Sequence, residues 1–98
     1  MNDSAQLLIP DAAKTDPKSF EILRVWVAHK GQHVSLRAGV WGDPAAWGIM
    51  LADLASHIAT SYQQDARSDR LKTLQRIKAA FDAELASPTD DPSGQIIR

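Results

Sequence analysis

Two β-rich segments, residues 20–28 and 34–41, lie on either side of a short polar linker that contains Lys30 and Gly31. Both segments are rich in valine, isoleucine, leucine and tryptophan, and the β-branched and aromatic residues among these favour extended strands. Two such segments joined by a short glycine-containing linker predict an antiparallel β-hairpin. Because an isolated hairpin is marginal in water, the fold must cover at least one of its faces.

The register of the hairpin follows from side-chain alternation. A two-residue turn at Lys30-Gly31 would pair Val27 with Val34, whereas a slip of one residue would place Val27 opposite His33 and lose the apolar face. One face then carries apolar residues alone, and we expect it to be the core: Leu23, Val25, Val27, Val34, Leu36, Ala38 and Val40. The other face is mixed, with large aromatic residues where a solvated face would be polar. It comprises Phe20, Ile22, Arg24, Trp26, Ala28, His33, Ser35, Arg37, Gly39 and Trp41.

Two amphipathic helices follow the hairpin. Asp43-Pro44 is typical of a helix start, and Pro88 ends the second helix. A polar stretch predicts a break near residues 64–68, with Ser68 or Asp69 as the cap of the second helix. Large residues at helical spacing predict the core-facing stripes. These are Trp47, Met50 or Leu51, Leu54, Ile58 and Ser61 or Tyr62 in the first helix, and Leu71, Leu74, Ile77 or Lys78, Phe81 and Leu85 in the second.

The predicted fold is therefore α+β, an antiparallel hairpin followed by two amphipathic helices packed on one sheet face. Residues 6–9 are a candidate for a short third strand at the sheet edge. Residues 1–18 are predicted to be an extended N-terminal arm, 19–86 a single α+β domain, and 87–98, with two prolines and a glycine, a disordered tail.

Composition narrows the function classes. The 98 residues have room for one domain, and the net charge of −1 gives no general attraction for nucleic acid or anionic membranes. The absence of cysteine excludes disulfides, thiolate catalysis and cysteine-ligated metals, and it fits a reducing compartment. The apolar runs are too short for a membrane span or a signal peptide, so we expect a cytoplasmic protein with no membrane partner.

A homodimer is expected from the mixed face. Both helices are assigned to the apolar face, which leaves Phe20, Ile22, Trp26 and Trp41 uncovered within the chain. Such a patch is larger than monomers usually expose. We expect pairing with a second copy, through the sheet edge or through that face; an unidentified protein partner is the other candidate.

The candidate binding residues are on the same face: Arg24, Arg37, Trp26, Trp41 and His33. The Lys30-Gly31 turn would place Arg24 directly opposite Arg37, where like charges repel. In one interpretation an anion or an acidic partner group binds between the two arginines. In the other, which we favour, the guanidinium groups stack on tryptophan and pair with acids of a second copy or near Glu21. Single-stranded nucleic acid could also stack there, but the acidic chain disfavours it.

No catalytic, metal or cofactor site is predicted. His57 lies four residues after Asp53, which allows two metal ligands on one helix face, yet the sequence offers no third ligand. The serines lack a nucleophile-elbow motif, and Gly39 and Gly42 do not form a phosphate-binding loop.

Residues 21–27 (EILRVWV), 34–36 (VSL) and 47–59 (WGIMLADLASHIA) resemble a small bacterial family of uncharacterised proteins, catalogued as a domain of unknown function. The resemblance runs from about Ser19 to Tyr62. It implies a compact cytoplasmic domain and brings no activity, cofactor or catalytic residue.

Overall fold

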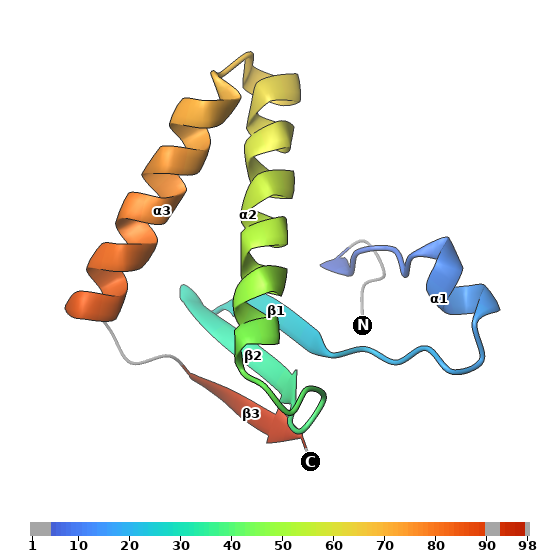
Figure 1. The fold of residues 1–98 in the computed structure, drawn as a ribbon. Coiled ribbons are helices and arrows are strands. Elements are labelled where there is room, and N and C mark those ends of the chain that lie inside the picture. The colour runs from blue at the N-terminus through green and yellow to red at the C-terminus, as the bar shows by residue number, and fades with distance from the viewer. Residues whose placement is uncertain (1–4, 90–92, 98) are drawn as a thin grey trace. The chain divides into compact units, whose positions relative to one another are not determined.

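The computed structural model describes residues 5–89 and 93–97. These residues form two compact units, one from 5–38 with 93–97 and the other from 39–89. The elements follow one another as α1 (Asp11–Thr15), β1 (Leu23–Ala28), β2 (Gly31–Arg37), α2 (Ala45–Ala66), α3 (Arg70–Ala86) and β3 (Ser93–Ile97). This order confirms the predicted α+β class, a hairpin followed by two long helices (Figure 1).

The hairpin turn lies one residue earlier than predicted. His29 and Lys30 form it, both with positive φ (50° and 63°), as a type I′ turn requires. Ala28 therefore pairs with Gly31, and Val25 pairs with Val34. The predicted pairing of Val27 with Val34 is wrong by two residues, although the same side chains still share each face because the shift is even.

Electrostatics favours the observed register. In the predicted pairing Arg24 would have faced Arg37, and like charges directly opposite each other destabilise a sheet. In the structure Arg24 faces Ser35, and the Arg37 N–H donates to the Ile22 carbonyl oxygen at 3.0 Å. The shift of two residues therefore separates the two guanidinium groups without exchanging the faces.

The third strand of the sheet comes from the C-terminal segment. β3 runs parallel to β2, with His33 paired to Ser93 and Arg37 paired to Ile97, so the order of the sheet is β1-β2-β3 (Figure 1). Residues 93–97 thus form a strand where the sequence predicted disorder, and residues 90–92 and 98 of that tail lie outside the described residues. The candidate strand at 6–9 is wrong, since those residues have no strand conformation.

The N-terminal arm forms the short helix α1 over Asp11–Thr15, where the sequence predicted an extended conformation. The Ser19 hydroxyl closes the segment after α1 by donating to the Ala13 carbonyl oxygen at 2.7 Å. Residues 1–4 of the predicted arm lie outside the described residues. The predicted domain boundaries after residues 18 and 86 stay predictions.

The helix ends confirm the predicted caps. The Asp43 carboxylate accepts a hydrogen bond from the Ala45 N–H at 2.9 Å and so satisfies a free donor at the start of α2. Arg67 ends α2 in a left-handed conformation, and the Asp69 side chain caps α3 by accepting from the Lys72 N–H at 3.1 Å. α3 ends at Ala86, two residues before Pro88.

The surface of α2 that contacts α3 consists of small residues. Burial in the second half of α2 is concentrated at Ala55, Ser56, Ala59 and Thr60, and Ala59, with no exposed surface, is the one fully buried hydrophobic side chain among the described residues. The matching side of α3 is its first half, where Arg70, Thr73, Leu74 and Ile77 are half-buried. The helices are joined at their turn and lie farther apart at their other ends (Figure 1).

The predicted core stripe of α2 is therefore not the surface that contacts α3. Leu51, Leu54, Ile58 and Tyr62 are exposed, because the small side chains on the neighbouring face allow the closer approach of the two helix backbones. The predicted packing of the helices on one face of the sheet would be a contact between the two units, and it stays a prediction. Among the described residues, no helix is long and apolar enough to cross a membrane.

Candidate functional site

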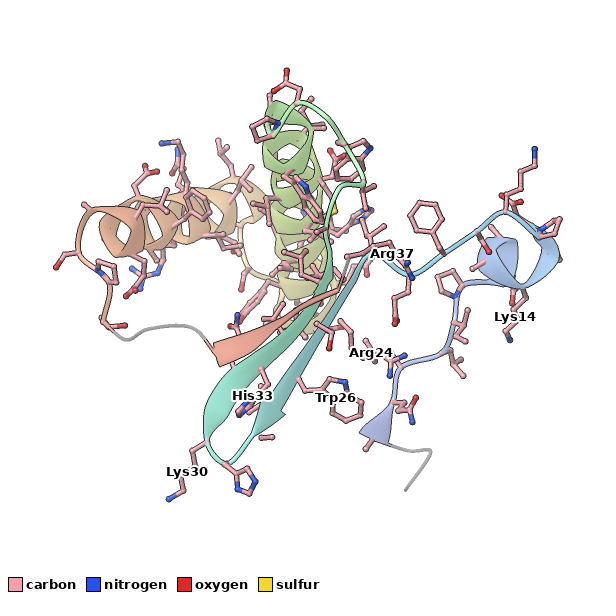
Figure 2. All side chains as sticks on the ribbon, turned by 90° about the horizontal axis from the view of Figure 1, so that it is seen from below. Lys14, Arg24, Trp26, Lys30, His33 and Arg37 are labelled. Carbon is pink, nitrogen blue, oxygen red and sulfur yellow. The ribbon has the colours of Figure 1, made fainter. Side chains whose placement is uncertain are left out.

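The candidate face lies on the hairpin, where β1 and β2 bring Trp26 and His33 directly opposite each other. Their side chains lie on the same side of the hairpin, with Lys30 at its tip and Arg37 at its far end (Figure 2). Trp26 is half-buried, and Arg24, His33 and Arg37 are exposed. The structure thus brings four of the five predicted binding residues onto one face.

Glu21 is the acid that holds Arg24. Arg24 Nε and Nη2 both donate to Glu21 Oε2, at 3.3 and 3.2 Å, and Nε also lies 3.2 Å from Glu21 Oε1. Both side chains remain about half exposed, and solvent screening makes such a pair weak in stability terms. The Glu21 carboxylate offsets part of the Arg24 charge.

Arg37 binds the backbone of the same residue. Its Nε donates to the Glu21 carbonyl oxygen at 3.0 Å, and its guanidinium carbon lies 5.3 Å from the centroid of the Phe20 ring, within range of a cation–π interaction. The two arginines therefore contact Glu21 at different atoms and do not face each other in the sheet. Arg24 thus pairs with Glu21, as the favoured interpretation allowed, whereas Arg37 stacks on Phe20 and not on the tryptophan that this interpretation named.

His33 is tied to the hairpin end. Its Nε2 lies 3.0 Å from the Ala28 carbonyl oxygen and donates to it, since a carbonyl can only accept. The histidine thus holds a fixed orientation beside Trp26.

Trp41 does not belong to this face. It follows β2 in the other unit, where its ring packs edge-to-face against Trp47 with centroids 4.9 Å apart and planes at 75°. The two tryptophans thereby pack against each other across the corner that precedes α2.

The electrostatics of the face are modest. The charges of Arg24 and Glu21 offset each other within the pair. Arg37, the other arginine of the face, has no acidic side chain bonded to it among the described residues. Sequence reasoning named Glu21 only as part of a neighbourhood. The sequence signal for this pair was that Glu21 precedes Arg24 by three residues. This spacing brings side chains together on a helix, but it does not do so regularly on a strand.

Two other predicted or visible features offer no site. Among residues 5–89 and 93–97, no group of three or more His, Cys, Asp or Glu side chains is gathered to hold a metal ion, and Asp53 and His57 are both exposed on α2. An open hollow beside the N-terminal arm is lined by that arm alone, from Gln6, Leu7, Leu8, Ile9 and Lys14.

Comparison with known proteins agrees with this fold. The family model described as Domain of unknown function (DUF5076) matches residues 6–89, which confirms the resemblance to an uncharacterised family. A similar solved structure is that of a "putative pyruvate dehydrogenase from the photosynthetic bacterium Rhodopseudomonas palustrus CGA009". It is 32% identical to this chain, with a TM-score of 0.74 and coverage of 90% of each chain. No curated protein sequence matches the chain.

Proposed function

The chain belongs to the DUF5076 family, and we propose that it acts as a self-associating interaction module, a homodimer that can also present its surface to a further protein partner. The observation that carries the proposal is the exposure of large apolar side chains on β1, α2 and α3. Val27 in β1 is 82% exposed, and Leu85 in α3 is 70% exposed. Each such side chain costs free energy in water, roughly 25 cal/mol per Å² of apolar surface.

A stripe along α2 has the spacing of a helix–helix contact. It begins at the half-buried Trp47 and continues through the exposed Leu51, Leu54 and Ile58, at intervals of four, three and four residues. This is the alternation by which apolar residues line the seam of a coiled coil. Since the small residues of α2 are already used against α3, the stripe remains for another surface.

The alternative function is the binding of an anion or small molecule at the aromatic–arginine face, which we define as Phe20, Arg24, Trp26, His33 and Arg37. Arg37 and Phe20 support it, because a guanidinium beside an aromatic ring suits a planar anionic group. The internal pairing of Arg24 with Glu21 weakens it. The name of the Rhodopseudomonas protein suggests an enzyme activity but identifies no catalytic residues, so this activity does not enter the proposed function.

Sedimentation of the full chain from low to high micromolar concentration tests the proposal. We expect a dimer over this range, and a monomer throughout would overturn it. Thermal unfolding with and without inorganic phosphate tests the alternative. Stabilisation by more than about 1 kcal/mol at millimolar phosphate would support anion binding.

A further inference from the structure

The outer edge of β1 carries free backbone groups. In an antiparallel pair, residues alternate between those that bond to the neighbouring strand and those that turn away from it. The bond from the Arg37 N–H to the Ile22 carbonyl shows that the even-numbered residues of β1 turn toward β2. The N–H and C=O groups of Leu23, Val25 and Val27 therefore point outward, and no strand of the described residues pairs with this edge.

This edge has few of the features that keep natural edge strands apart. Proline, charged side chains (lysine above all), a bulge or a covering segment normally block edge-to-edge pairing. β1 has the sequence LRVWVA, with neither proline nor lysine, and its one charged residue, Arg24, is paired with Glu21. β1 pairs with β2 at six consecutive positions without a bulge. Val25 and Val27 are 52% and 82% exposed. A second strand can add to β1 without rearrangement of the sheet.

We propose that β1 pairs antiparallel with β1 of a second copy of this chain, with Val25 on the two-fold axis. This inference rests on the proposed function and names the surface through which self-association occurs. In this register Val25 faces Val25 of the partner, and Leu23 faces the partner's Val27. Every outward N–H and C=O of these three residues then gains a hydrogen bond.

The side chains are self-complementary in the same register. On the apolar face, Leu23 lies against Val27 of the partner and Val25 against its own copy. On the other face, Arg24 lies opposite Trp26 of the partner at a position without backbone bonds, where side chains approach most closely. A guanidinium over an indole ring gives a favourable cation–π contact.

Neighbouring registers are less favourable. An axis at Arg24 would place the two Arg24 side chains opposite each other, and like charges so placed repel. An axis at Trp26 would place Leu23 opposite His29 of the partner, which lies in the turn and has φ of 50°. Val25 is thus the axis that uses the whole strand and avoids the charge clash.

Single-cysteine variants test the register, because the chain has no cysteine of its own. In Val25→Cys the two Cα atoms across the axis would be about 5.5 Å apart, within disulfide range. In the control Val27→Cys the two Cα atoms would be roughly 14 Å apart, since they are four residues apart along the strand direction. Under mild oxidation we expect the Val25→Cys dimer to form about tenfold faster or more, although Val27 is the more exposed residue.

A second variant tests the hydrogen bonds. Val25→Pro removes an outward N–H and leaves the bonds to β2 in place, a substitution that edge strands tolerate. We expect dimer dissociation about tenfold stronger or more than in the parent chain, with the circular dichroism of the monomer unchanged. Equal cross-linking rates for Val25→Cys and Val27→Cys in a chain that still sediments as a dimer would overturn the edge pairing and leave self-association standing. A monomeric parent chain would overturn both.

Discussion

Arg70 Nε donates a hydrogen bond of 3.0 Å to the Thr60 hydroxyl oxygen, which joins the first turn of α3 to the last part of α2. The same hydroxyl donates to the Ser56 carbonyl oxygen at 3.1 Å, so it acts as donor and acceptor at once. Thr60 and Arg70 are half-buried beside Ala59. The turn between the helices is thereby held by a side-chain contact as well as by the backbone.

Arg70→Ala should lower the free energy of unfolding by about 1 kcal/mol, because a half-buried hydrogen bond is lost. Urea denaturation measures the change. Arg76→Ala, on the exposed side of the same helix, is the control and should cost less than about 0.5 kcal/mol. In a double-mutant cycle with Thr60→Val, the double variant should lose less unfolding free energy than the sum of the two single variants. Fully additive losses would contradict the contact.

Ala59→Leu should lower the free energy of unfolding by about 1–3 kcal/mol. Ala59 is fully buried where α2 contacts α3, and a larger side chain there forces the helices apart. The matched control is Ala52→Leu, at an exposed position one turn before Ser56 on the same helix, and it should be close to neutral. Equal effects in thermal or urea unfolding would show that the helices do not pack through Ala59.

The turn at His29-Lys30 can be tested by replacing it with Asn-Gly. Both residues have positive φ, which costs roughly 1 kcal/mol or more for an ordinary L-residue, so the replacement should raise stability by about that amount. Gly31→Ala is the control for the register. A Cβ at Gly31 meets no atom closer than 3.8 Å and its φ is not positive, so the substitution should be tolerated. A large loss of stability in Gly31→Ala would instead favour a turn at Lys30-Gly31.

Lys78 gives a pH-dependent prediction. Its Nζ donates to the Asp82 carboxylate at 2.8 Å, and this hydrogen bond, followed by the charge attraction, raises the pKa of Lys78 above its usual 10.5. The contribution to stability is therefore present below pH 10.5 and is lost as the pH rises through the raised pKa of the folded state.

Asp82→Asn should return the Lys78 titration toward 10.5, as measured by NMR of the lysine side chain. Glu84→Gln is the control, because Glu84 accepts hydrogen bonds from Thr89 and should leave Lys78 unaffected. An unchanged Lys78 titration in Asp82→Asn would contradict the pairing.

Local sequence signals determined the elements of this fold. The hairpin follows from two β-rich segments, and Asp43 and Asp69 cap their helices because a short carboxylate side chain reaches backbone N–H groups within a few residues. Side-chain alternation also determined which residues share a face, and the register shift of two residues preserved it. The interpretation that Arg24 pairs near Glu21 rests on the same short range.

Only the tertiary structure decided the features that depend on partners distant in sequence. The pairing of β3 with β2 joins residues that lie some sixty positions apart, and no local pattern in residues 93–97 encodes that neighbour. The same holds for α2, where helical spacing selected the large side chains from Leu51 to Tyr62 and the contact with α3 uses Ala59 instead. Alternation and helical periodicity fix the direction of each side chain relative to its own element, whereas the surface that is finally covered depends on which element arrives against it.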